Sequence, residues 1–181
     1  MDIERNQNVL GKLDAVDREI LNVLQEDCSL TINEIRDEVE TRLRRKKILA
    51  RSIPRTTVHA KIKRMEQLEV IKARRAIVAD ERVGKKVTAF AFVKYQAVRP
   101  DSKSSDEIAF ESMINKLKIM PGVQEIHTIA GEYDMLVKIK GESIKDIADV
   151  ILGKIRRLDG VTGSLTSFVL RKHMENTKID I

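Results

Sequence analysis

Apolar residues recur at helical spacing in three successive segments of the first third of the chain. In the first segment, LDAVDREILNVLQED, the apolar stripe consists of Leu13, Val16, Ile20, Val23 and Leu24. The second segment, TINEIRDEV, repeats the pattern, and its residues Thr31 and Glu34 have the spacing of a capping box. The third, SIPRTTVHAKIKRMEQL, has the stripe Val58, Ile62 and Met65, with Pro54 in its first turn and Ser52 as its expected cap. These patterns predict three short helices.

A second pattern follows, in which strand-like and helix-like segments alternate. The segment KLKIMPGV (116–123) returns 38 residues later as KIRRLDGV, and each copy ends a helix-like stretch and begins a strand-like one. A strand-like segment, VTAFAFVKY or MLVKIK, precedes each helix. The predicted order is strand, helix, strand, strand, helix, strand, which is a ferredoxin-like α+β sandwich. Its core is expected to contain Met113, Leu117, Ile147, Ile151 and Ile155.

The two helices of this sandwich are expected to cover only one face of the sheet. The other face also has apolar positions, such as Phe90 and Phe92 or their alternates. An uncovered apolar sheet face indicates a partner, most simply a second copy of the chain. The residues GEYD (131–134) are expected to connect the two middle strands of this order, with Gly131 in a tight turn at positive φ.

The distribution of charge singles out one segment of the 181-residue chain. The net charge is only +6, but residues 41–64 contain ten Lys and Arg and no acidic residue, although the chain has 28 Asp and Glu. A basic block on a near-neutral body is typical of proteins that bind an anionic partner. A solvated basic loop is the alternative.

The third predicted helix has a face without carboxylates. With Val58 in the core, the residues that point away from it or flank that face are Thr56, Thr57, His59, Ala60, Lys63 and Arg64. Such a face suits the DNA major groove, because cations neutralise phosphates while hydroxyl, imidazole and cationic groups reach base edges. We predict base or groove contacts from Thr56, Thr57, His59 and Lys63, and phosphate contacts from Arg55 and Arg64. The two helices before it favour a helix-turn-helix over a basic surface helix.

The segment KARRAIVA (72–79), which follows this helix, contains the strand-like residues Ile77 and Val78. We expect it to form a wing or a strand that leads into the second domain. The charged stretch with Gly84 that comes next indicates a domain boundary.

Five segments in this order resemble the leucine-responsive regulator/asparagine regulator (Lrp/AsnC) family of bacterial and archaeal transcription factors. They are LDAVDREILNVLQED, TTVHAKIKRMEQLEVI, ADERVGKKVTAFAFV, MPGVQEIHTIAGEYDMLVKIKG and LDGVTGSLTSFVLRKHMENTKIDI. The resemblance implies a tail, a winged helix-turn-helix domain, a linker, a ferredoxin-like effector and oligomerisation domain and a second tail, at residues 1–12, 13–79, 80–86, 87–172 and 173–181.

The resemblance also implies partners. Family members bind double-stranded DNA, form homodimers through their sheets and often gather into octamers, and many bind an amino-acid effector between dimers. The effector residues carried over from the hairpin motif are Gly131, Glu132, Tyr133 and Asp134, where Glu132 replaces the commoner Asp. No cofactor is implied.

One segment departs from the family pattern, which has a short turn between the second and third helices. Here residues 40–52, ETRLRRKKILARS, are inserted between Val39 and Ile53. Either the second helix extends into this segment, or the segment forms a mobile basic arm. We expect it to add phosphate contacts beside the third helix, from Arg44, Arg45, Lys46, Lys47 and Arg51.

Three other functions fit less of the sequence. A low-specificity architectural DNA-binding protein without an effector is favoured by the basic insertion. An RNA-binding module of the same strand and helix order would stack bases on sheet aromatics, but MLVKIK contains none. An enzyme is not expected, because His59, His127 and His173 lie in separate predicted elements and none is at metal-ligand spacing from Cys28.

Two further features bear on the compartment. No apolar run approaches the roughly 20 residues needed to cross a bilayer. Cys28 is the only cysteine, so no intramolecular disulfide can form. We therefore expect a cytoplasmic protein without membrane association.

Overall fold

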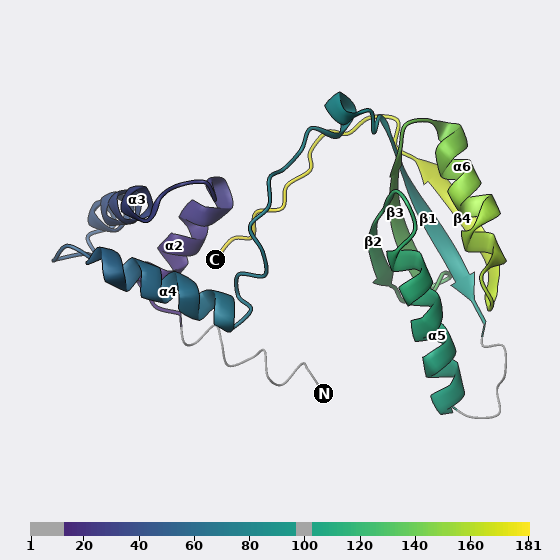
Figure 1. The fold of residues 1–181 in the computed structure, drawn as a ribbon, viewed down its shortest axis with the longest axis horizontal. Helices are drawn as coiled ribbons and strands as arrows, with labels where there is room; N and C mark the ends of the chain where they lie inside the picture. Colours follow the sequence, from purple (N-terminus) through teal and green to yellow (C-terminus); the bar gives the residue numbers. More distant parts are fainter. Residues whose placement is uncertain (1–12, 97–102) are drawn as a thin grey trace. The chain divides into compact units, whose positions relative to one another are not determined.

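Figure 1 shows the computed structural model, which describes residues 13–96 and 103–181 of the chain. These residues form two compact units. The helical unit consists of the described residues up to Ile77 together with Glu175–Ile181, and the sheet unit lies within Val78–Met174. The chain therefore passes between the units twice, before Val78 and after Met174. The predicted tail of residues 1–12 lies outside the described residues.

The helical unit contains the three predicted helices, α2 (Ala15–Glu26), α3 (Ile32–Arg45) and α4 (Arg55–Gln67). Their apolar stripes meet in one core. Its side chains with at most 2% of their area exposed include Ile20, Val23, Ile35, Val39, Leu43, Val58, Ile62 and Met65. The periodicity prediction is confirmed for all three helices, because each stripe can leave water only by packing against the other two.

Side chains cap the starts of the first two helices. Asp14 and Asp17 form a capping box at α2, and Thr31 and Glu34 form one at α3. The Thr31 N–H donates to the Glu34 carboxylate at 2.7 Å, and the Glu34 N–H donates to the Thr31 hydroxyl at 3.3 Å. The predicted Thr31–Glu34 box is therefore confirmed.

Helices α3 and α4 both end with a residue other than glycine in the left-handed conformation. Lys47 has φ 57° and Glu69 has φ 56°. The Ile48 N–H donates to the Leu43 carbonyl at 2.9 Å, and α4 repeats this bond from Val70, as in a Schellman motif. The left-handed conformation costs a residue with a Cβ roughly 1–2 kcal/mol. Both turns are therefore strained in a way that glycine would relieve.

The start of α4 differs from the prediction. Ser52 does not cap this helix, whose N-cap residue is Pro54 and has no side-chain hydrogen bond. The Ser52 hydroxyl and the Ile53 N–H instead donate to the same oxygen of Glu40 on α3, each at 2.6 Å. The cap prediction is wrong because tertiary structure brings a carboxylate of the preceding helix within reach of both donors.

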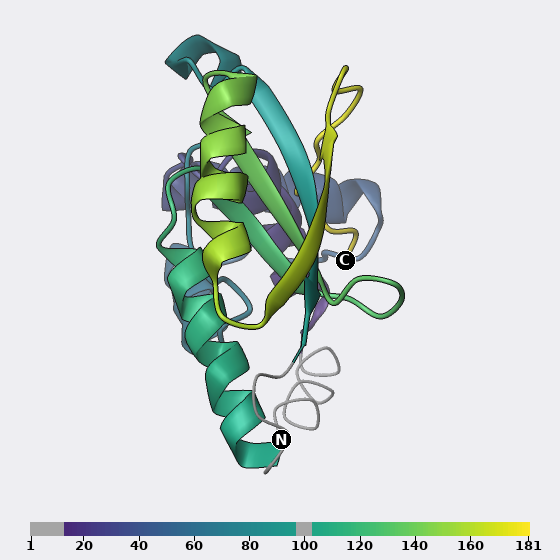
Figure 2. The same cartoon turned by 90° about the vertical axis from the view of Figure 1, so that its right-hand side faces the viewer.

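The sheet unit contains the predicted order of strands and helices. The elements are β1 (Val87–Tyr95), α5 (Lys103–Lys118), β2 (Val123–Thr128), β3 (Met135–Gly141), α6 (Ile144–Gly153) and β4 (Val161–Phe168). The strands lie in the order β2-β3-β1-β4, and neighbours are antiparallel. Figures 1 and 2 show α5 and α6 on one face of the sheet. The predicted α+β fold is confirmed. Within the described ranges, no helix is long and apolar enough to span a membrane.

Fully buried and less buried side chains alternate along β1, because successive residues of a strand point to opposite faces of the sheet. Ala89, Ala91 and Val93 are buried together with the predicted core residues Met113, Leu117, Ile147, Ile151 and Ile155. Phe90 and Phe92 alternate with these buried residues, and Phe92 pairs with Leu136 on β3 and Leu165 on β4. Leu165 is 49% exposed. This open face therefore has an apolar strip, made of Phe90, Phe92, Leu136 and Leu165, opposite the face on which the helices pack.

The segment that enters the sheet unit also differs from the prediction. Residues 72–79 form no strand or wing, and they have no secondary structure. An extended segment is a strand only where it pairs with another one. The linker expected at residues 80–86 begins with a 3₁₀ turn, η2 (Asp80–Val83). Lys140 and Lys172 lie 2.8 and 3.2 Å from the Asp80 carboxylate, hold its pKa well below the usual range and fix the turn to the sheet unit.

Candidate nucleic-acid interface and effector hairpin

Helix α4 presents an exposed face without a carboxylate before Glu66. The exposed residues are Arg55, Thr56, His59, Ala60, Lys63 and Arg64, and Thr57 is half-buried. Val58, Ile62 and Met65 hold the opposite face in the core. Glu66, the first acidic residue of the helix, forms an ion pair with Arg74 at 2.7 Å. The surface expected from the sequence is thus open to solvent and has the composition that suits a polyanion.

Two cations of α4 bind acidic groups of the segment that begins α2. Lys61 Nζ lies 3.1 Å from the Asp17 carboxylate and 2.5 Å from that of Asp14. A guanidinium nitrogen of Arg64 lies 2.8 Å from Asp17, whose side chain has no exposed area. A buried carboxylate is costly without partners, so these ion pairs have a structural role. A phosphate contact by Arg64 has to compete with Asp17.

The first part of the basic insertion continues α3 and is also paired with acids. Arg42 lies 2.7 Å from both Glu26 and Glu38, and these hydrogen bonds raise the pKa of Arg42. Lys46 Nζ lies 2.6 Å from Glu19, whose side chain is 5% exposed. Part of the insertion therefore balances acidic side chains of α2 and α3, which distinguishes it from a simple basic arm.

Other basic side chains in residues 41–64 are exposed and make no ion pair with another described residue. They are Arg45, Lys47, Arg51, Arg55 and Lys63. The first three belong to the insertion and the last two to α4. Arg44 is exposed as well, but its guanidinium lies 3.4 Å from Glu40. The structure thus separates the basic block into cations held by carboxylates and cations available to phosphates.

The predicted effector hairpin is fastened to β1 by Asp134. The Asp134 N–H donates to the Val93 carbonyl at 3.0 Å, and its carboxylate accepts the Tyr95 N–H at 2.7 Å. Gly131 has φ 137°, as a turn glycine should, and a Cβ at this position would meet nothing within 4 Å. The carboxylate expected to meet an effector ammonium group is therefore already shared with the backbone of β1.

Glu132 and Tyr133 both contact Lys94. The Glu132 carboxylate lies 3.1 Å from Lys94 Nζ, and this hydrogen bond raises the pKa of Lys94. Lys94 Nζ lies 5.1 Å from the centre of the Tyr133 ring, which lies 5.6 Å from that of Phe92. The hairpin thus places two carboxylates and an aromatic ring beside the apolar strip of the sheet.

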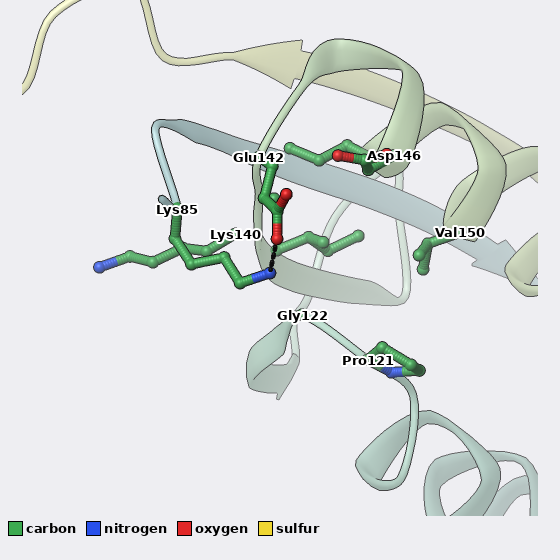
Figure 3. Close-up of a pocket in the computed structure, with 10 residues that line it drawn as sticks. Lys85, Pro121, Gly122, Lys140, Glu142, Asp146 and Val150 are labelled. Carbon is green, nitrogen blue, oxygen red and sulfur yellow. Dashed lines mark hydrogen bonds and ion pairs between the residues drawn. The ribbon is translucent and has the colours of Figure 1, made fainter. Parts of the chain in front are cut away.

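A separate cavity of about 210 Å³ lies at the other ends of β2 and β3 (Figure 3). Its polar lining includes Lys85, Glu142 and Asp146, and Lys85 lies 3.1 Å from Glu142. Residues 131–134 do not line it, so the structure does not bring the predicted effector residues to this cavity. In the part of the chain that the structure describes, no group of three or more His, Cys, Asp or Glu side chains is placed to hold a metal ion.

Two residues that position α4 were missed by the sequence analysis. Glu40 binds the segment that enters the helix, and Asp17 binds two of its cations. Asp17 is recognisable in the sequence as an acidic residue in the first turn of a helix. No local pattern marks its pairing with Lys61, which is 44 residues away.

Comparisons with known proteins agree with this architecture. The family model described as "Lrp/AsnC ligand binding domain" matches residues 88–179. HTH-type transcriptional regulator FL11 of Pyrococcus furiosus is 29% identical over 171 residues, which are 94% of this chain and 98% of the relative. An uncharacterized HTH-type transcriptional regulator of Pyrococcus horikoshii is 32% identical over 162 residues, 88% of this chain and 95% of the relative.

Solved structures are similar in fold. A transcriptional regulator of Neisseria meningitidis in complex with L-Met has a TM-score of 0.76 at 23% identity, and the match covers 92% of this chain and 96% of that one. AsnC of E. coli has a TM-score of 0.71 at 22% identity, with 92% and 97% covered. Both matches extend over most of the chain and therefore include the helical unit as well as the sheet unit.

Proposed function

The chain belongs to the Lrp/AsnC family of DNA-binding transcriptional regulators, and we propose that the exposed face of α4 binds its operator in the major groove. One observation supports this assignment above the others: the face of α4 without carboxylates is exposed while Val58, Ile62 and Met65 keep the opposite face buried. On this proposal the base or groove contacts come from Thr56, Thr57, His59 and Lys63. We assign the protein no catalytic role, and we propose that it is located in the cytoplasm.

We propose that phosphate contacts come first from the cations that have no carboxylate partner among the described residues. These are Arg55 on α4 and Arg45, Lys47 and Arg51 in the insertion. Three other cations remain predicted phosphate contacts, but each already pairs with a carboxylate: Arg44 with Glu40, Lys46 with Glu19 and Arg64 with Asp17. Phosphate contacts orient a protein on the duplex and strengthen binding to all sequences, whereas base contacts discriminate between sequences.

The test is a charge reversal on α4. The operator is first located by genome footprinting, and the affinity of Lys63→Glu for it is measured by fluorescence anisotropy. Each lost base contact weakens binding by about 1–3 kcal/mol, and a carboxylate facing phosphates adds repulsion. Lys145→Glu, the same change at an exposed residue of α6, is the matched control. Operator affinity of Lys63→Glu equal to that of the control would show that a different face contacts DNA.

We propose that the apolar strip around Phe92 is a homodimer interface, and that dimers can assemble further, up to octamers. Leu165 is the most accessible test position, since it is 49% exposed and lies across from Phe92. Leu165→Glu is expected to lower the sedimentation coefficient toward that of the monomer, because a carboxylate is costly to bury at an apolar interface. Unchanged sedimentation of Leu165→Glu would place the dimer contact elsewhere.

We propose that an amino acid is the effector and that the hairpin Gly131, Glu132, Tyr133 and Asp134 contributes to its site. L-Met is the first ligand to test, because it is bound in the Neisseria structure, and the other amino acids follow. Titration calorimetry would compare the native chain with Asp134→Asn, which removes the charge expected to bind the ammonium group. Asp149→Asn, at an exposed position of α6, is the control. Equal heats for both variants would exclude Asp134 as a ligand.

A low-specificity architectural role is the second candidate. It is favoured by Arg45, Lys47 and Arg51, because such exposed cations strengthen binding to any sequence. The ratio of operator to random-DNA affinity separates the two functions, since specific regulators reach about 10³ or more. A ratio near unity at physiological salt would favour the architectural role.

A further inference from the structure

The last residues of the chain are bound to the end of α2. The Ile179 N–H donates to the side-chain oxygen of Gln25 at 2.7 Å, and the side-chain nitrogen of Gln25 donates to the Ile179 carbonyl at 3.0 Å. One amide side chain thus satisfies both backbone groups of one residue, as a neighbouring strand would. Such a contact selects an extended backbone and does not depend on the side chain of Ile179.

An ion pair lies next to this contact. Lys178 Nζ lies 2.6 Å from the Glu26 carboxylate, which also binds Arg42 of α3. The hydrogen bonds from Arg42 and then Lys178 lower the pKa of Glu26 to about 2, so this carboxylate is charged at neutral pH. The C-terminal segment therefore binds where α2 and α3 are already joined.

The same segment is fastened to the sheet unit at its other end. The Val169 N–H donates to the Thr88 carbonyl at 2.9 Å, and Lys172 Nζ lies 3.2 Å from Asp80. Between Lys172 and Lys178 the chain advances six residues, which reach at most about 20 Å when extended. The two ends of this short stretch are thus held on different units.

We propose that residues 173–181 are a strap whose docking on Gln25 and Glu26 gives the helical unit a second short tether to the sheet unit. A body held only by residues 72–79 can rotate about that connection. A second tether excludes most of these orientations, because both connections must be satisfied at once. The strap therefore limits how far the helices move relative to the sheet without fixing one arrangement.

The docking is tested in the full-length protein by hydrogen exchange of the Ile179 amide. The Gln25→Ala/Lys178→Met variant removes both contacts, and Ala and Met keep the helix propensity and the side-chain length. Exchange at Ile179 is expected to become about tenfold faster, since the lost contacts together amount to roughly the free energy of a tenfold change. Thr177→Ala, in the same segment, is the control and is expected to exchange like the native chain. Fast exchange of Ile179 in the native chain, or equal rates in the double variant, would overturn the docking.

The tether is tested by the distance between the units, measured by pulsed electron–electron double resonance. Nitroxide labels are placed at Arg18→Cys on α2 and Lys145→Cys on α6, in a Cys28→Ser background diluted with unlabelled protein. The distance distribution is expected to broaden when Gln25→Ala/Lys178→Met is added. Equal widths with and without these substitutions would overturn the strap. Neither measurement uses DNA, so failure of the proposed operator contacts leaves both results decisive.

Discussion

Removing the carboxylate of Glu40 should loosen the start of α4, the helix that we propose to bind DNA. This carboxylate accepts the Ser52 hydroxyl and the Ile53 N–H, each at 2.6 Å, and its side chain is 15% exposed. Helix α4 has no side-chain cap hydrogen bond at its N-cap residue, and these two hydrogen bonds join its entry to α3. Glu40→Ala breaks both and leaves the N–H of the buried residue Ile53 without its acceptor.

The size of the effect follows from these two bonds. A hydrogen bond to a charged group contributes about 1.5–3 kcal/mol when shielded, and less when one partner is exposed as Ser52 is. We expect Glu40→Ala to lower the free energy of opening of α4 by about 2–3 kcal/mol. Glu40→Gln keeps an acceptor oxygen and should lose about half as much. A double-mutant cycle that combines Glu40→Ala with Ser52→Ala should give a coupling free energy of about 0.5–1 kcal/mol.

The contribution of Glu40 should also depend on pH. The hydrogen bonds from Ser52 and then Ile53 lower the pKa of Glu40 in the folded protein. Its stabilisation is therefore fully present above the unfolded-state pKa of about 4.3 and is lost as the pH falls through the lower folded-state value. The difference between the native chain and Glu40→Gln should shrink in that acidic window.

Hydrogen exchange of α3 and α4 peptides, measured against urea, reports the helical unit separately from the sheet unit. Asp37→Ala is the control, because Asp37 lies one turn earlier on α3 and is 65% exposed. Among the described residues, its side chain pairs with the adjacent Arg36 alone. It should change stability by no more than about 0.5 kcal/mol. The reasoning is refuted if Glu40→Ala has an effect as small as that control, or if the Ser52 cycle shows no coupling.

Three further predictions follow from the geometry. Lys47→Gly should stabilise the helical unit by about 1 kcal/mol in urea unfolding, because glycine adopts the left-handed turn without strain; a destabilised variant would show that the φ of 57° is not costly here. Gly122→Ala should destabilise the sheet unit by about 2–3 kcal/mol, since its φ is 81° and a Cβ would lie 2.4 Å from the Lys140 carbonyl oxygen; native stability would mean that this turn can rearrange. Replacing Arg45, Lys47 and Arg51 by Gln should reduce the slope of log affinity against log salt by up to about 2.7, with little change in the preference for the operator over random DNA; an unchanged slope would exclude these phosphate contacts.

Much of the fold was predictable because its signals are local. The stripes of α2, α3 and α4 and the repeat in the second half each follow from residues within one segment, and the observed helices and strand order agree with them. The Thr31–Glu34 box is predictable for the same reason, since both groups lie in one helical turn. The prediction of a wing or strand over residues 72–79 was wrong, because a strand needs a second strand to pair with. The spacing of side chains in one segment does not show whether such a partner is present.

The sequence predicted which face of α4 is exposed, but it did not predict which cations are paired with carboxylates. The orientation of α4 follows from Val58, Ile62 and Met65, whose burial turns the basic side outward. Pairing of Arg64 with Asp17 joins residues 47 positions apart, and pairing of Lys46 with Glu19 joins residues 27 apart. Composition shows that both cations are present, but only their neighbours in space determine whether they are available to phosphates.

By itself, the sequence determined which segments are helices and strands, which side of each is apolar, and that positive charge gathers around one helix. These properties depend on groups a few residues apart, where backbone geometry fixes the distances. Tertiary structure decided that Glu40 holds the start of α4, that α2 binds part of the basic block, and that Gln25 binds the backbone near the C-terminus. Each of these contacts joins segments that are far apart in the chain. Their ion-pair and hydrogen-bond partners therefore depend on how the helices pack in three dimensions, which the spacing of residues within one segment does not show.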